Sequence, residues 1–426
     1  MQIMETKQTT KMRIATGLLL ICVLAAALSG CNTQIQAADL MAGVSANTTA
    51  GKAADDAFIR AQADLSAALF RAAAAESRGE SLLISPLSIQ LALAMTANGA
   101  DGQTLAEMET LLGSGIPLDE LNEYYRACAD ALPSADGYQL HIANSIWFRD
   151  QQGLTVEKDF LQRNADYYGA QAYKAPFDGQ TLKDINNWVK QNTNGMIDRI
   201  LDEISAETKL YLINALTFDA EWAVAYEESD IRDGAFTSYG GEKRTVEMMH
   251  SEESKYFSGD SAVGFLKDYK DSKYAFAALL PDADVDLYAY IDSLTGEKLL
   301  QTLGSFKSGS VAVTMPKFSY DDELRLNGLL ENLGMPTAFD NGKADFTRMA
   351  SCADGNLFIG DILHKTFISV DERGTRAGAA TAVAMNSESI SVPELTVTLD
   401  RPFVFMILDN TNGLPIFIGA VTDIQA

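Results

Sequence analysis

The sequence predicts a single large α+β domain, because helical patterns fill its first half and strand-like runs fill its second. Apolar residues at helical spacing predict helices over 55–78, 85–97 and 184–201. Runs rich in apolar and β-branched residues predict strands in the second half. Helices followed by strands are typical of α+β folds, whereas alternation is typical of βαβ folds. No Pro- or Gly-rich linker interrupts residues 55–426, which are therefore expected to form one domain.

The helices carry recognisable end signals. The first is expected to stop at Gly79, and the second opens with Ser85 and Pro86, because Ser caps a helix and Pro suits its first turn. Residues 104–131 favour short helices with an acidic face. The helix over 184–201 is interrupted by an Asn-Gly pair. Further helical stretches are expected at 284–303 and 322–334, and strands at 141–148, 210–218, 274–280, 311–318, 367–370, 395–399, 403–408 and 416–420.

A tract of small residues, 371–385, lies between two of these strand-like runs. Its odd positions are all small or apolar: Thr375, Ala377, Ala379, Thr381, Val383 and Met385. Successive strand side chains point to opposite faces, so one face of this tract could enter a packed core while the other stays in water. Gly and Ala are poor strand formers, however. The tract is therefore predicted to be a mobile loop in one state and a strand in another.

The N-terminus reads as a targeting segment. Lys11 and Arg13 precede an apolar run that is too short for a membrane span and ends in Leu-Ser-Gly-Cys at Cys31. This ending resembles a bacterial lipoprotein signal, which implies a signal peptide over 1–30 and a lipid on Cys31; the alternative is an ordinary signal with a chance cysteine. Residues 31–54, rich in Ala, Thr, Asn and Gly, are expected to form a flexible tether. The protein is then expected outside the cell, held at the surface by its lipid.

Charge and composition exclude several functions. The net charge of −25 argues against nucleic acid partners, which need basic patches. His141, His250 and His364 lack ligand spacing, so no metal and no cofactor are expected. Cys128 and Cys352 could form one disulfide or remain free thiols, and free thiols are favoured. The chain has no G-x-S-x-G, phosphate-binding or dinucleotide motif, and it is not expected to be an enzyme.

Several segments, in order, resemble the serpins, the serine protease inhibitors of a single α+β fold. The segments are 83–89 with 97–100, 144–148, 185–189 with 193–195, 212–218 with 221–222, 364–365 with 371–375, 401–405 and 414–419. The resemblance covers about residues 58–422. It implies three β-sheets, about eight to nine helices and an exposed reactive loop. It also implies a monomer that traps a protease when the cut loop inserts into the central sheet.

The resemblance implies roles for particular residues. Ser85, Ser88, Asn214 and His364 match a polar cluster under the sheet where strands part; by themselves, Ser85 could be a plain helix cap and His364 a core histidine. Trp222 matches the place where insertion begins, although an ordinary core Trp fits equally well. The hinge comprises Glu372, Gly374, Thr375, Ala377, Ala379 and Thr381, and a solvent turn is the alternative for its first residues.

The bait bond follows from the family's spacing. Counting about 14 residues from Gly374 places it between Glu388 and Ser389, which suits a glutamyl-specific protease. A shift in register would bring Met385 or Ile390 to the bond and favour elastase- or subtilisin-like targets. Glu388 could equally be a solubilising charge.

The resemblance therefore implies an irreversible inhibitor of extracellular serine proteases, and also of cysteine proteases. The departures from the family at Arg376 and Gly378 fall on the face expected to stay in water, so inhibition is expected to survive. The alternative is a serpin-fold binding or adhesion module that does not inhibit. A solute-binding lipoprotein would need alternating βαβ lobes, which the pattern lacks.

Overall fold

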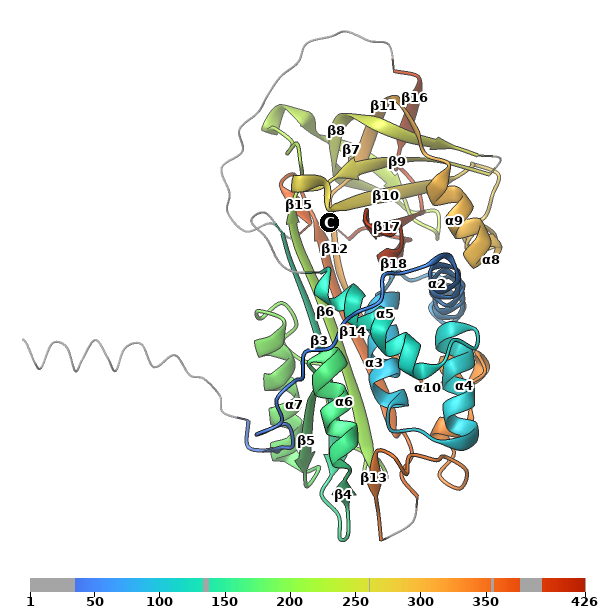
Figure 1. Cartoon of the computed structure of the whole chain (residues 1–426). Coiled ribbons are helices and arrows are strands. Elements are labelled where there is room, and N and C mark those ends of the chain that lie inside the picture. The colour runs from blue at the N-terminus through green and yellow to red at the C-terminus, as the bar shows by residue number, and fades with distance from the viewer. Residues whose placement is uncertain (1–34, 133–137, 260, 354–355, 376–392, 426) are drawn as a thin grey trace, which may run out of the picture. The chain divides into compact units, whose positions relative to one another are not determined.

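The computed structural model describes residues 35–132, 138–259, 261–353, 356–375 and 393–425. The chain divides into Met1–Gln36 and Ala37–Ala426, and all the elements described here belong to the second unit. That unit is built from one long sheet, a second sheet of nine strands and helices packed on both (Figure 1).

The long sheet has seven strands in the order β1-β5-β3-β6-β15-β14-β12. Their bounds, in that order, are Ala38–Asp39, Gln171–Ala175, Tyr138–Arg149, Leu210–Glu221, Gly374–Thr375, Asp361–Val370 and Phe318–Arg325. β6 runs antiparallel to β3 and parallel to β14. Nearly every residue of β6 is buried, as expected of a central strand covered on both faces.

The second sheet has the order β16-β11-β8-β9-β10-β17-β18-β2, and β7 pairs with β8. These strands span Leu395–Thr398, Lys307–Pro316, Lys243–Ser258, Ala262–Asp268, Tyr274–Pro281, Phe403–Asp409, Pro415–Val421 and Leu82–Ile84, with β7 at Ile231–Thr237. A small third sheet joins β4 (Thr155–Val156) to β13 (Ala350–Ser351).

Nine α-helices lie within the described residues: α2 (Asp56–Glu76), α3 (Pro86–Ala97), α4 (Gly102–Gly113), α5 (Leu118–Asp130), α6 (Lys158–Tyr168), α7 (Gly179–Asn192), α8 (Leu287–Ser293), α9 (Gly296–Gly304) and α10 (Asn327–Asn332). The predicted α+β class is confirmed. α3 is buried almost all round because it lies between the long sheet and β18, while α7 covers the opposite face near β3. Ser85 caps α3 as predicted, accepting a hydrogen bond from the Ser88 amide at 3.2 Å.

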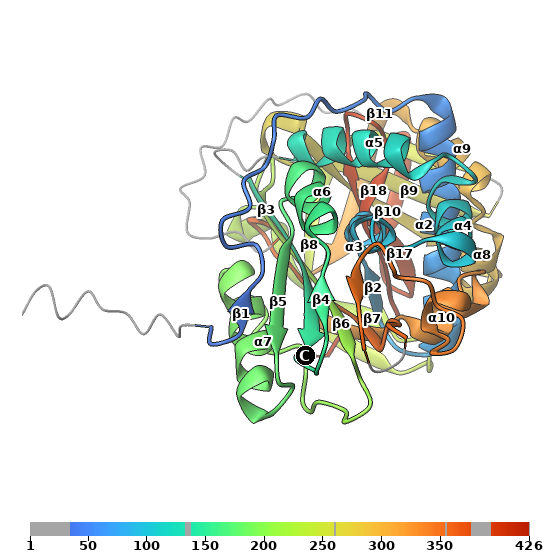
Figure 2. The same cartoon turned by 60° about the horizontal axis from the view of Figure 1, so that its bottom comes forward.

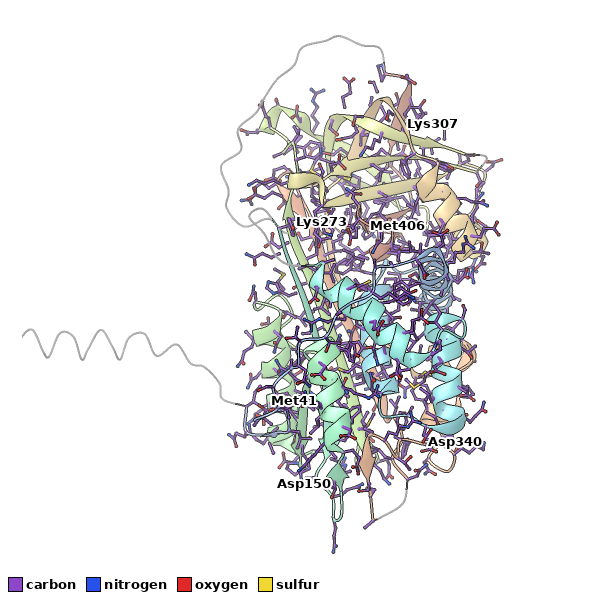
Figure 3. All side chains as sticks on the ribbon, in the orientation of Figure 1. Met41, Asp150, Lys273, Lys307, Asp340 and Met406 are labelled. Carbon is purple, nitrogen blue, oxygen red and sulfur yellow. The ribbon has the colours of Figure 1, made fainter. Side chains whose placement is uncertain are left out.

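The core consists of two apolar clusters. Among the described residues, one cluster joins the helices other than α7 to the long sheet and to β10, β17 and β18, and the other fills the space beneath the second sheet. Met406 of β17 belongs to the first cluster, is fully buried and lies among packed side chains in Figure 3. Interiors packed in this way have little spare volume, so a new strand can enter only where strands already part.

Some predicted elements differ from the structure. The prediction of a helix over 322–334 is wrong for its first residues, because β12 runs to Arg325 and α10 starts only at Asn327. β7, β8 and β9 were not predicted. Exposed charged residues hide the apolar alternation of β7 and β8, while in β9 Gly264 and the buried Lys267 interrupt the apolar run. The helix expected over 184–201 is α7, which ends at Asn192, before the Asn-Gly pair.

The segment before α2 is packed against the domain instead of hanging free as the expected tether. β1 pairs with β5, and the Ala37 amide donates to Asp184 at 2.8 Å. Figure 2 shows the chain then passing along α6 and α5 to α2. Asn47 donates from its amide to Asp166 at 2.7 Å, and the Lys52 amide donates to the Glu123 carbonyl at 2.9 Å. Within the expected tether, residues 37–54 are therefore part of the folded domain.

Gly51 offers a test of this packing. A Cβ built at Gly51 would lie 2.7 Å from the backbone nitrogen of Ala127 in α5, closer than real side chains approach. Gly51→Val should push the segment off α5 and lower the free energy of unfolding by about 1–2 kcal/mol, as other overpacked sites do. Denaturant unfolding measures this. Ala50→Val, at an exposed neighbouring position, is the control, and equal stability of the two variants would contradict the packing.

Candidate functional site

The site begins where β6 and β14 stop pairing with each other. Their direct pairing runs from Asp361 to Thr366 on β14. Above it, β15 lies between the two strands: Gly374 pairs with Glu221, and Thr375 pairs with both Ala220 and Val370. The hinge has therefore already started a strand at the centre of the long sheet.

A buried polar atom marks the point where the strands part. Thr217 follows the last β6 residue that pairs with β14, and its side chain is fully buried. Its Oγ1 has no hydrogen-bond partner among the described residues. Buried polar groups normally have partners, so this atom belongs to a stretch of sheet whose bonding is incomplete.

The predicted polar cluster assembles just below this point. His364 and Asn214 are register partners on β14 and β6, and Asn144 faces Asn214 on β3. The Ser85 amide donates to His364 Nε2 at 3.1 Å, so Nδ1 carries the proton and donates to Asn214 Oδ1. Asn214 Nδ2 in turn donates to the Ser88 carbonyl at 2.9 Å and to Asn144 Oδ1. The cluster thus joins three strands to the start of α3.

His364 is held in its neutral form. It is fully buried, and burial lowers the pKa of its imidazole from 6.5 to about 3. A charged imidazole would lack solvation there. Its protonated Nε2 would also face the Ser85 amide N–H, whose hydrogen bond the neutral Nε2 accepts.

Gly374 is required for close approach. A Cβ at this position would lie 1.9 Å from the Ala220 carbonyl oxygen, so only glycine lets β15 enter beside β6. Thr375 is 1% exposed and its hydroxyl bonds to the Tyr269 hydroxyl at 2.5 Å. The prediction that Thr375 is a small inward residue agrees with this position.

Trp222 holds the backbone just before β15. Its indole Nε1 donates to the Asp371 carbonyl at 2.9 Å and its amide donates to the Arg373 carbonyl at 2.8 Å. The indole stacks on Tyr269, with ring centroids 4.5 Å apart. The Tyr226 amide adds a bond to the Glu372 carbonyl at 2.9 Å. Trp222 therefore contacts the backbone that leads into β15, and its role at the start of insertion stays a prediction.

Glu372 is paired with Lys317, which lies between β11 and β12 and whose Nζ is 2.9 Å from Glu372 Oε2. Burial alone would raise the pKa of Glu372, but the hydrogen bonds from Lys317 and from its own backbone amide, together with the charges of Lys317 and Arg373, outweigh burial, and the pKa falls below its usual value. Lys317 also reaches Glu247 at 3.3 Å. This ion pair steadies the first residue of the hinge.

The remaining predicted residues lie outside the described part of the chain. They are Cys31, the hinge residues Ala377, Ala379 and Thr381, the bond residues Glu388 and Ser389, and the alternatives Met385 and Ile390.

Sequence reasoning missed four residues of the site. Asn144 stood in a predicted strand, and only the register of β3 against β6 reveals its role. Tyr269, Tyr226 and Lys317 gave no signal, because their contacts with the hinge span 50 residues or more of sequence and depend on the assembled sheets.

Three further features of the described residues concern metal ligands, disulfides and membrane-spanning helices. Within them, no group of three His, Cys, Asp or Glu side chains could hold a metal ion. Cys128 and Cys352 are free thiols, as the sequence favours. No helix in the described ranges is both long and apolar enough to span a membrane.

The neutral His364 predicts an acid-sensitive stability. The unfolded imidazole takes up a proton near pH 6.5, whereas the folded one resists until about pH 3. The free energy of unfolding should therefore fall as the pH drops through this window, by up to roughly 1.4 kcal/mol per pH unit. His364→Gln keeps an acceptor for the Ser85 amide but cannot titrate, so its unfolding free energy should fall less steeply.

Denaturant unfolding at several pH values compares the two slopes. Burial raises the pKa of Asp322 to about 6, so this carboxyl titrates in the same window, but it does so in both proteins and cancels from the comparison. Equal slopes would show that His364 is not the buried neutral group described here.

Comparisons with known proteins agree with this geometry. The family model described as Serpin (serine protease inhibitor) matches residues 60–424. The crystal structure of the thermophilic serpin tengpin in its native state is 47% identical, covers 92% of this chain and 100% of its own, and superposes with a TM-score of 0.88. A serpin-like protein of Thermococcus kodakarensis is 31% identical over 348 residues, 79% of each chain. Human serpin B9 is 29% identical and covers 81% of this chain and 93% of its own.

The family match spans nearly all of the folded unit, and it includes both the polar cluster and the described part of the hinge. The chain belongs to the serpin family.

Proposed function

We propose that this protein irreversibly inhibits extracellular serine proteases, and cysteine proteases by the same route, through insertion of its cut loop into the long sheet. The observation that carries the proposal is the position of β15 between β6 and β14. Serpins are generally inhibitors of serine proteases rather than catalysts. A strand that has entered the sheet by two residues needs only a free end to continue.

The chemistry is that of an interrupted peptide cleavage. The protease serine attacks the carbonyl carbon of the bait residue, forming an ester while the amine of the next residue leaves with a proton. Glu388 and Ser389 are proposed for these positions, with Met385 or Ile390 as the alternatives. Release of the amine separates the two loop halves. The N-terminal half, still bound to the protease, can then extend β15 downward.

The sheet supplies the driving force. About 14 inserted residues make a strand of roughly 46 Å, at about 3.3 Å per residue. To accommodate it, β6 and β14 would have to separate along the segment where they now pair, and the inserted strand would then give hydrogen-bond partners to the facing edges of both. A protease carried that distance loses its fit to the ester, so the water-dependent second half of the reaction stalls.

The extracellular, lipid-anchored location is part of the proposal, on the strength of the signal ending at Cys31. In a bacterial host given a radiolabelled fatty acid, the chain should carry label and remain with the membrane fraction. Cys31→Ala should abolish the label, because it removes the thiol that the lipid would modify. Label that persists in the variant would contradict acylation at Cys31.

The direct test mixes the protein with glutamyl-specific, elastase-like and subtilisin-like proteases. At least one should give a complex that survives SDS, since an ester bond joins the two chains. Mass spectrometry of the released C-terminal peptide then identifies the bond. Cleavage by every protease without a complex would favour the alternative, a serpin-fold binding module. A protease with a blocked active serine is the control.

Thr375→Arg should convert the inhibitor into a substrate. Thr375 is 1% exposed, and burying an unpaired guanidinium there costs several kcal/mol. Loop insertion should therefore become slower than hydrolysis of the ester. The measurement is the number of inhibitor molecules consumed per protease trapped, which should rise several-fold. Thr375→Ser, which keeps a small hydroxyl for Tyr269, should inhibit as wild type does. Unchanged inhibition by the arginine variant would refute the insertion geometry.

A further inference from the structure

A lysine is buried beneath the site. Lys267, on β9, is 3% exposed, and its Nζ lies 2.8 Å from Oε1 of Glu253 on β8. Lysine is almost never buried unless paired. A buried ion pair is weak support for stability, since apolar residues of similar volume often serve as well or better. The pair therefore calls for an explanation other than stability.

The ammonium faces two aromatic rings. Lys267 Nζ lies 4.4 Å from the ring centroid of Tyr226 and 5.5 Å from that of Trp222, within the range of cation–π attraction. The Tyr226 hydroxyl lies 3.3 Å from the Ser251 hydroxyl, and Ser251 donates to Glu253 at 2.7 Å. Lys267, Glu253, Ser251 and Tyr226 thus form a closed ring of contacts, which we name the lysine brace.

The two residues whose rings contact Lys267 also bind the hinge backbone. The Trp222 amide and indole bond to the carbonyls of Arg373 and Asp371, and the Tyr226 amide bonds to the carbonyl of Glu372. Trp222 and Tyr226 therefore each connect Lys267 to the backbone that must move when the loop inserts. An apolar side chain at 267 could fill the same space, but it would not attract the faces of both rings.

We infer that Lys267 is a positioning residue for loop insertion: it holds Trp222 and Tyr226 against the hinge and so delays insertion while the loop is uncut. This inference rests on the proposed function. It assigns to the brace a kinetic role. While the loop is uncut, the contacts of Trp222 and Tyr226 with the hinge backbone slow its insertion into the long sheet. Cleavage frees one end of the loop, and insertion then proceeds despite these contacts.

The test compares Lys267→Met with wild type. Methionine has similar length and no charge, so it removes the brace and keeps most of the volume. The uncut protein is held at a temperature below its unfolding transition, and samples are given a brief protease pulse. Material whose uncut loop has inserted by itself will resist cleavage and remain a folded monomer. This loop-protected fraction should grow several-fold faster in Lys267→Met than in wild type.

Two further variants separate positioning from general damage. Lys267→Arg keeps a cation and should restore most of the delay. Lys255→Met removes a half-exposed lysine on β8 that pairs with Asp268 at 3.5 Å, and it should leave the rate unchanged. Glu253→Gln should accelerate loop protection as Lys267→Met does, and the double variant should add little to either, because both belong to one network.

The inference is overturned if loop protection grows equally fast in Lys267→Met and wild type. It is also overturned if Lys267→Met only unfolds or aggregates faster, with no rise in folded, loop-protected monomer, since that is the behaviour of an ordinary core residue. The proposed function fails separately, if wild type forms no SDS-resistant complex with any protease. The loop-protection assay needs no inhibition, so the two failures are distinguishable.

Discussion

β6 and β14 share hydrogen bonds along only part of their length, and the other features of the site follow from this. Where the two strands pair, His364 and Asn214 stand opposite each other and tie the long sheet to the start of α3. Where they part, Thr217 is left with an unpaired buried hydroxyl among the described residues, and the hinge enters from above. An incomplete central sheet stores free energy that a further strand can release, so a folded state of this kind persists by a kinetic barrier.

In the proposed mechanism, this barrier lies at the hinge. Gly374 fits against the Ala220 carbonyl with no room for a side chain, and Trp222 and Tyr226 bind the three residues before it by their backbone. Lys317 pairs with Glu372 on one side, and the buried Lys267–Glu253 pair supports the aromatic layer on the other.

The sequence predicted the class of fold, the long helices and the polar cluster, because these depend on local pattern and on motifs in order. It did not predict β7 and β8, whose charged outer faces mask their alternation, or β9, where Gly264 and the buried Lys267 interrupt the apolar run. It also did not predict the strand character of the residues around Asp322. It predicted Trp222 and Thr375 but not Tyr269, which joins them, because that contact spans 106 residues of sequence. The composition of residues 37–54 predicted a tether, because composition gives no sign of the backbone pairing between β1 and β5.

The most direct measurement compares thermal unfolding of the intact protein with that of the same protein after its loop is cut. If the native sheet is incomplete and the hinge leads the loop into it, the cut form should unfold at a much higher temperature, by tens of degrees. A cut form that melts at the same temperature as the intact one, with its new chain end still open to digestion, would contradict the claim that β15 is the start of an inserting strand.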